Sequence, residues 1–193
     1  MMEKYVILIT SPPACGKTRL AKRLATELED VVYLDKDSLI PLSKQIFKVA
    51  KKRYNRSSAF FQKNIRDYEY EVIINQAFEA IKYAKRVIIN APFTQEVRDA
   101  KFAKDFRDKV NKAGAKLLVV WISATPELCR FRMFKRNSDR DKWKIDNWDE
   151  YIKSVNFDPP TVFDEDELFV HKNANDDEAD EHFARLIEKI NKC

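Results

Sequence analysis

The chain has 193 residues, of which 45% are hydrophobic, and it carries a net charge of +5. This length and composition favour one compact domain, which we expect to span residues 1–193. The sequence has no apolar run of the roughly 18 residues that cross a membrane and no signal-peptide pattern at its start. We therefore expect a cytoplasmic protein without a membrane partner, and its positive charge favours ligands that carry phosphate.

The cysteines and histidines exclude two classes of protein. Three cysteines, Cys15, Cys129 and Cys193, form an odd and scattered set that predicts no disulfide framework. The two histidines, His171 and His182, have no metal-ligand spacing relative to these cysteines. A zinc enzyme is therefore not expected, and Cys15 is interpreted as a residue that fits its loop.

Buried strands and amphipathic helices alternate along the chain. The predicted elements, in order, are a strand at 5–10, a helix at 17–28, a strand at 31–34, a helix that starts near Ser38, a long helix at 58–84, a strand at 86–90, a helix at 97–113, a strand at 117–122, a helix at 126–137, a weak strand at 168–170 and a helix at 176–191. Continuous apolar strands joined through helices predict an α/β fold, with a parallel sheet covered on both faces. Ligands of such sheets bind at the carboxyl ends of the strands.

The segment SPPACGKT at 11–18 differs by one residue from the phosphate-binding pattern G-x-x-x-x-G-K-[ST]. It lies between a predicted strand and a predicted helix, so backbone N–H groups and the helix N-terminus can surround a phosphate. The pattern assigns Lys17 to the β- and γ-phosphates and Thr18 to magnesium. The candidate nucleotide-binding residues here are Pro13, Ala14, Cys15, Gly16, Lys17, Thr18 and Arg19.

Ser11 stands where the pattern has its first glycine. Pro12 and Pro13 each fix φ near −65° and can supply the turn in another way. Because a residue that precedes proline favours an extended backbone, we expect Ser11 to keep a negative φ. The loop can then hold a phosphate without that glycine.

Two aspartates follow the second predicted strand. We interpret Asp37 as the carboxylate that acts on an acceptor hydroxyl, and Asp35 as a residue that handles magnesium. The alternative is a solvated turn in which Ser38 caps a helix. Asn90 ends the third strand, where many P-loop proteins have an aspartate. An amide cannot act as a base, which places metal and base chemistry on the two aspartates and disfavours fast hydrolysis.

Further candidates follow the third and fourth strands. Phe93 and Arg98 are candidates for acceptor binding, although Arg98 fits an exposed helical charge equally well. Arg132 and Arg136 are four residues apart on a predicted helix and share one face. Arginines in such a position can neutralise the charge that develops during phosphoryl transfer, and the alternative is a solvated charged face.

These motifs, in this order, resemble the small P-loop kinases. They look most like the bacterial ATP-binding AAA-domain group related to zeta toxin, polynucleotide 5′-kinase and gluconate-kinase-like enzymes. The resemblance rests on SPPACGKT, LDKD at 34–37, VIINAPF at 87–93 and ELCRFRMFKR at 127–136. It implies a three-layer P-loop NTPase fold with a five-stranded parallel sheet in the order 2-3-1-4-5, ATP and Mg²⁺ as ligands, and a helical lid at about 126–156. It also implies that Asn173 borders the adenine.

The leading interpretation is a Mg-ATP-dependent transfer of phosphate to a hydroxyl of an unidentified small molecule. Its catalytic residues would be Lys17, Asp37, Arg132 and Arg136. The acceptor is expected against a helical region at about 38–84, whose aromatic residues fit a core better than a substrate site. One alternative is a kinase for nucleic-acid 5′-hydroxyls, which the charge favours slightly. Another is a nucleotide-binding regulatory ATPase with weak turnover, which Asn90 leaves open.

Overall fold

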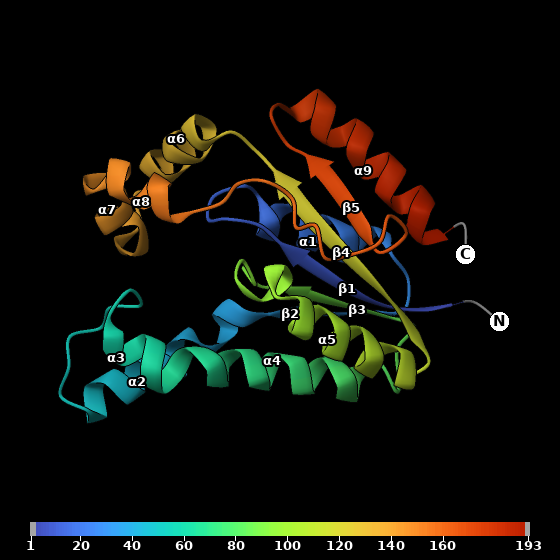
Figure 1. The fold of residues 1–193 in the computed structure, drawn as a ribbon, viewed down its shortest axis with the longest axis horizontal. Coiled ribbons are helices and arrows are strands. Elements are labelled where there is room, and N and C mark those ends of the chain that lie inside the picture. The colour runs from blue at the N-terminus through green and yellow to red at the C-terminus, as the bar shows by residue number, and fades with distance from the viewer. Residues whose placement is uncertain (1–2, 192–193) are drawn as a thin grey trace.

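The computed structural model describes residues 3–191, except for the side chains at positions 139 and 140. Its centre is a five-stranded parallel sheet in the order β2-β3-β1-β4-β5, which confirms the predicted order (Figure 1). The strands are β1 (Lys4–Thr10), β2 (Val31–Asp35), β3 (Arg86–Asn90), β4 (Ala115–Ser123) and β5 (Leu168–Lys172). The central strand β1 pairs with β3 and β4, and it is buried from Tyr5 to Thr10. Burial on both faces explains why its sequence is apolar without alternation.

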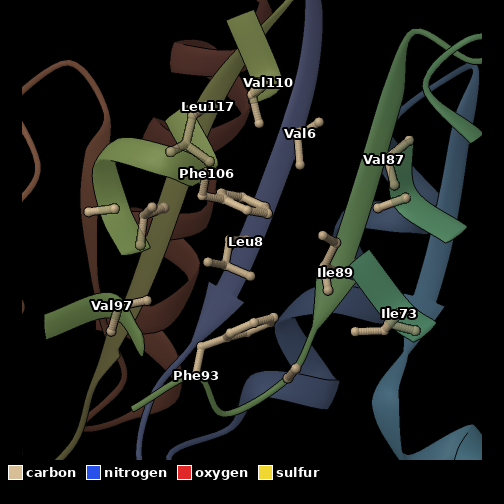
Figure 2. Packing of buried hydrophobic residues seen from close by; sticks show 14 of the residues in the cluster. Val6, Leu8, Ile73, Val87, Ile89, Phe93, Val97, Phe106, Val110 and Leu117 are labelled. Carbon is tan, nitrogen blue, oxygen red and sulfur yellow. The ribbon is translucent and has the colours of Figure 1, made fainter. Parts of the chain in front are cut away.

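Helices cover both faces of the sheet, as the alternating pattern predicts. Helices α1 (Lys17–Glu27) and α9 (Asp176–Asn191) pack on one face, and α4 (Asp67–Ala80) and α5 (Ala100–Lys112) pack on the other (Figure 1). Figure 2 shows the second of these layers, where Leu8 and Ile89 of the sheet face Phe93 and Phe106. The two packed layers fix the sheet, so the loops at its carboxyl edge extend from a rigid base.

The remaining elements lie at that edge or beside it. They are η1 (Lys36–Leu39), α2 (Ile40–Val49), α3 (Ala59–Phe61), the π-helical turn η2 (Gln62–Arg66), η3 (Glu96–Arg98), α6 (Pro126–Arg136), α7 (Asp139–Asp146) and α8 (Trp148–Ser154). In Figure 1, α6, α7 and α8 lie on one side of a space and α2 and α3 on the other. The helix predicted at 58–84 is therefore wrong as one element, because a π-helical turn separates α3 from α4.

Two predicted helix starts are also corrected. The helix expected from residue 97 begins at Ala100, because the side chain of Asp99 accepts a hydrogen bond from Phe102 N and caps it. Ser38 is not an N-cap, because it lies inside η1 and Asp35 caps that turn. In both cases an aspartate takes the capping position.

The aromatic residues of the 38–84 region form a small core of their own. Phe47, Phe61 and Ile65 are buried together, and Tyr54 and Phe60 pack against them. This agrees with the expectation that the aromatic residues there serve packing. The cluster joins α2 to α3 and so holds these short helices beside the sheet edge.

No helix within residues 3–191 combines the length and the apolar character that crossing a membrane requires.

Candidate functional site

A cavity of about 490 Å³ lies where the loops leave the carboxyl ends of β1, β2 and β3. This volume is in the range of small-molecule sites. One side, called here the P-loop side, contains Pro13, Ala14, Gly16, Lys17, Thr18, Arg19, Asp35, Asn90, Arg132, Arg136, Asp141 and Lys144. The other, called the α2–α4 side, contains Lys36, Asp37, Ile40, Arg56, Ser57, Phe61, Gln62, Arg66 and Tyr70. The structure thus brings most of the residues predicted from the sequence to one cavity.

The P-loop bends at different residues than its missing glycine suggested. Ser11 is fully buried and is not among the residues with positive φ, which agrees with the expected extended backbone. The left-handed positions are Ala14, with φ of 65°, and Gly16, with φ of 113°. The loop therefore makes its turn after the two prolines, at Ala14, where the motif requires no glycine, and at Gly16, which is the motif's second glycine.

Lys17 is folded back onto the start of its own loop. Its Nζ donates hydrogen bonds to the carbonyl oxygens of Ser11 and Pro12, both at 2.9 Å. Burial lowers the pKa of Lys17 to about 8. The lysine thus has backbone partners in the loop, and it also lines the cavity.

Asn173 and Arg132 hold the loop from outside. The carbonyl oxygen of Cys15 accepts from Asn173 Nδ2 at 2.6 Å and from Arg132 Nη1 at 3.2 Å. A Cβ atom on Gly16 would lie 2.4 Å from Asn173 Nδ2. Gly16 is therefore required both by its backbone angle and by the close approach of Asn173.

A pair of buried cysteines lies beneath the same loop. The sulfur atoms of Cys15 and Cys129 are 3.3 Å apart, and both residues are fully buried. The hydrogen bond from Cys129 lowers the pKa of Cys15 to about 7, with help from the charge of Lys17, and the same contact raises the pKa of Cys129. Sequence analysis missed this pair because the two cysteines are 114 residues apart and no spacing rule links them.

Thr18, Asn90 and Asp35 form a hydrogen-bonded group on the P-loop side. Asn90 Nδ2 donates to Thr18 Oγ1 at 3.2 Å and to Asp35 Oδ2 at 3.0 Å. Tyr33 also donates to Asp35 Oδ2, at 2.7 Å. Burial and this carboxylate raise the pKa of Tyr33, so its hydroxyl stays protonated.

This group has the oxygen chemistry that Mg²⁺ prefers. The buried Oδ1 of Asn90 has no hydrogen-bond partner among residues 3–191, and a hydroxyl and a carboxylate lie beside the amide. The described part of the chain contains no cluster of three acidic, histidine or cysteine side chains that could hold a metal alone. Since Mg²⁺ commonly combines few protein ligands with phosphate oxygens and water, the residues present fit that ion together with a nucleotide.

Asp35 also sets the position of Asp37. Its Oδ1 accepts a hydrogen bond from Asp37 N at 2.9 Å and so caps η1. This turn leaves Asp37 exposed in the cavity wall, whereas Lys36 between them is buried. Asp35 is therefore hydrogen-bonded to Asn90 on the P-loop side, whereas Asp37 is exposed on the α2–α4 side.

The two predicted arginines of α6 both line the cavity. Arg132 reaches the P-loop side through the carbonyl oxygens of Cys15 and Asn173, each at 3.2 Å. Arg136 Nε lies 2.8 Å from Asp141 of α7, a fully buried carboxylate that Lys144 also approaches. The predicted face of α6 is thus directed toward the loop and toward α7.

Four of the predicted residues do not line the cavity, namely Cys15, Phe93, Arg98 and Asn173. Phe93 is fully buried between Tyr70 and Phe102, so it does not line the cavity. Arg98 lies over the Trp121 ring at 5.1 Å and donates to the Asp158 carbonyl oxygen. We retain neither Phe93 nor Arg98 as an acceptor-binding residue.

Asn173 also lies outside the cavity wall. It is buried and uses its amide to hold the Cys15 carbonyl. These contacts hold the P-loop in place, and they give no indication that Asn173 borders an adenine.

The structure adds a buried ionic cluster that the sequence gave no reason to select. Glu69 Oε2 lies 2.6 Å from Lys36 Nζ and 2.7 Å from Arg56 Nη2, and Glu69 Oε1 accepts from Ser43 Oγ at 2.5 Å. Burial lowers the pKa of Lys36. The one available signal is that Glu69 interrupts an otherwise apolar helical face in α4.

Comparison with known proteins agrees with this fold. The sequence profile of the family described as "AAA domain" matches residues 6–157. Because the match covers most of the chain, the protein belongs to this AAA domain family. No curated protein matches the sequence.

Solved structures share the fold at low sequence identity. A protein from Chloroflexus aurantiacus is 16% identical, with a TM-score of 0.64 over 95% of this chain and 98% of its own. A gluconokinase from Sinorhizobium meliloti is 13% identical, with a TM-score of 0.54 over 98% and 95% of the two chains. The APS kinase CysC of Mycobacterium tuberculosis, in complex with AMPPNP and APS, is 13% identical, with a TM-score of 0.56 over 98% and 99%. The chain thus has the fold of the small P-loop kinases.

Proposed function

We propose that this protein is an ATP-dependent phosphotransferase that acts on a hydroxyl group of a small molecule. The observation that carries the proposal is the cavity itself, because Lys17, Asp37, Arg132 and Arg136 all line it. A P-loop, a separate exposed carboxylate and arginines from a neighbouring helix are the parts that phosphoryl transfer needs. The kinase-like fold supports the same reading.

Each residue has a task in this proposal. Lys17 leaves its backbone partners and binds the β- and γ-phosphates, and the loop N–H groups surround them. Thr18 and Asp35, with Asn90, would hold Mg²⁺, which supplies positive charge against the phosphate oxygens when bound. Arg132 and Arg136 offset the charge that grows on the transferred group.

The transfer forms one bond and breaks another. The acceptor hydroxyl oxygen bonds to the γ-phosphorus, and the bond between that phosphorus and the β–γ bridging oxygen breaks, so ADP leaves. Asp37 accepts the hydroxyl proton and returns it to water. Residues 126–156 would act as a lid over this step, and residues 38–84 would supply the acceptor side.

The test measures ATP binding and transfer separately. Calorimetry with Mg²⁺ and a nonhydrolysable ATP analogue should show at least tenfold weaker binding for Lys17→Ala, because the cation that pairs with the phosphates is lost. Lys22→Ala, an exposed change on the same helix α1, is the matched control and should bind normally. Equal binding by both variants would refute the nucleotide site.

An ATP-consumption screen over hydroxylated compounds then identifies the acceptor. With that acceptor, Asp37→Asn should keep analogue binding and lower the transfer rate about 100-fold, as expected for a lost general base. Unchanged transfer would remove Asp37 from the chemistry. Tight ATP binding with no transfer to any compound would favour the regulatory ATPase instead.

A further inference from the structure

The α2–α4 side of the cavity is rich in positive charge. Three cations line it, Lys36, Arg56 and Arg66, and Asp37 is the carboxylate in the same wall. The P-loop side has cations of its own for a nucleotide. The charge on the α2–α4 side therefore needs a separate explanation.

Both arginines are held by acids that stand behind the wall. Arg56 Nη2 contacts Glu69 at 2.7 Å, Arg66 Nη2 contacts Glu96, and Arg66 Nη1 contacts Asp67 at 2.9 Å. Neither Glu69 nor Glu96 lines the cavity. Arg66 also lies over the Tyr70 ring at 4.7 Å, and Arg56 lies 4.8 Å from the Phe61 ring. Acids and rings behind a guanidinium fix its orientation, so it is preorganised for a ligand in front.

Arg56 has hydrogen-bonding capacity that the protein does not use. Its Nη1 and the hydroxyl of Tyr54 beside it are buried, and neither makes a well-formed hydrogen bond within residues 3–191, although Tyr54 interacts electrostatically with Arg56. A buried donor without a partner costs about 1–3 kcal/mol. Glu69, moreover, is shared between Arg56 and Lys36, so a single buried carboxylate faces two cations.

We propose that the phosphate acceptor is a small hydroxylated anion, with a carboxylate or phosphate group that Arg56 and Arg66 bind. This inference rests on the proposed function and names its substrate class. A carboxylate or phosphate matches the guanidinium fork and forms charge-assisted hydrogen bonds with it. A neutral polyol would leave Lys36 and Arg56 sharing the single carboxylate of Glu69.

The experiment fills the P-loop side first. The protein is saturated with Mg²⁺ and a nonhydrolysable ATP analogue, and matched compounds are then titrated by calorimetry. One set is glycerol, glycerate and glycerol phosphate, and the other is galactose, galacturonate and galactose phosphate. We expect an anionic member to bind at least tenfold more tightly than its neutral parent, because only the anion pairs with both arginines.

Substitutions test whether Arg56 and Arg66 cause the preference for the anion. Arg56→Gln and Arg66→Gln should each weaken binding of the anion at least tenfold and leave analogue binding unchanged. Arg56→Lys keeps the charge but loses the planar guanidinium fork, so its affinity for the anion should lie between those of the wild type and Arg56→Gln. Lys104→Gln, at an exposed position of α5, is the control and should bind the anion as the wild type does. Melting curves identify any variant that fails to fold, and Arg66→Gln and Arg56→Lys then carry the test.

Several results would overturn the proposal. They are equal binding of neutral and anionic members, unchanged anion binding by both glutamine variants, and no binding of any anion to the analogue-loaded protein. A 5′-hydroxyl oligonucleotide that binds more tightly than every small anion would assign the charge to nucleic acid instead. Failure of the proposed function differs from all of these, because the ATP analogue would then not bind in the absence of any acceptor.

Discussion

On the P-loop side of the cavity, the phosphate-binding loop is shaped by backbone geometry. Ala14 and Gly16 adopt left-handed angles, and the carbonyl oxygen of Cys15 is fixed by Asn173. The α2–α4 side has no such loop and depends on charged side chains, of which Lys36 and Arg56 converge on Glu69. Backbone can hold any phosphate in the same way, whereas charged side chains on a buried anchor select one ligand shape.

The difference also predicts where each side is vulnerable. The P-loop side depends on the absence of a side chain at Gly16, and the α2–α4 side depends on the presence of a charge at Glu69. Three substitutions test this contrast, beginning with the change that removes the anchor.

Glu69→Gln should cause the largest loss of stability. It leaves the buried Lys36 and the half-buried Arg56 without the carboxylate that they share, and breaking a buried ion pair in this way costs about 3–5 kcal/mol. The free energy of unfolding, measured with urea, reports the loss. Burial lowers the pKa of Lys36 below its unfolded value, so the unfolded state binds more protons in the alkaline range, and the stability of the variant should rise with pH there.

Glu79→Gln is the matched control. Glu79 also contacts a lysine, Lys82, but that pair is 59% and 62% exposed. Water screens exposed pairs, so the substitution should change stability little. Equal losses in the two variants would show that Glu69 is not an anchor.

Gly16→Ala should have the next largest effect, on the P-loop side. The new Cβ would meet Asn173 Nδ2 at 2.4 Å, and the backbone at φ of 113° disfavours any side chain. We expect a loss of about 2–3 kcal/mol in unfolding free energy. Binding of the ATP analogue should also weaken at least tenfold, because the loop must move.

Gly114→Ala separates strain from collision. Gly114 also has a positive φ, of 69°, but nothing lies within 4 Å of the added Cβ. It should lose only about 1 kcal/mol and should bind the analogue normally. The double change Gly16→Ala with Asn173→Ala should recover part of the loss, and a strictly additive result would contradict the close approach of Asn173.

The P-loop side could be predicted from the sequence because its chemistry is local. Strand, loop and helix follow one another in the sequence, so the positions of Lys17 and Thr18 at the sheet edge can be predicted once the parallel sheet is recognised. Asp37 and Arg132 were also predicted, since they follow strands whose carboxyl ends share one edge. Ala14 was not expected to have a positive φ, because the motif gives the turn to its glycines.

The rest could not be predicted because it depends on contacts between distant residues. Arg56 becomes part of the site only through Glu69 and the folding of α2 against α3. Phe93 and Arg98 were misassigned because adjacency to a strand end does not say which way a side chain turns. The pairing of Cys15 with Cys129 follows from β4 and α6 lying beside the loop, which no local pattern records.

Asn90→Asp is the smallest of the three changes and tests the P-loop side alone. It replaces the amide that donates to Asp35 Oδ2 at 3.0 Å with a second carboxylate. Repulsion and the lost hydrogen bond should lower the unfolding free energy by about 1–2 kcal/mol without metal. The loss should shrink as pH falls, because one carboxylate then takes up a proton.

Added Mg²⁺ should restore stability to the variant more than to the wild type, and urea unfolding with and without the ion measures this. Asn111→Asp, at an exposed position of α5, should show neither effect. If Mg²⁺ does not change the stability of Asn90→Asp, this group is not part of the metal site.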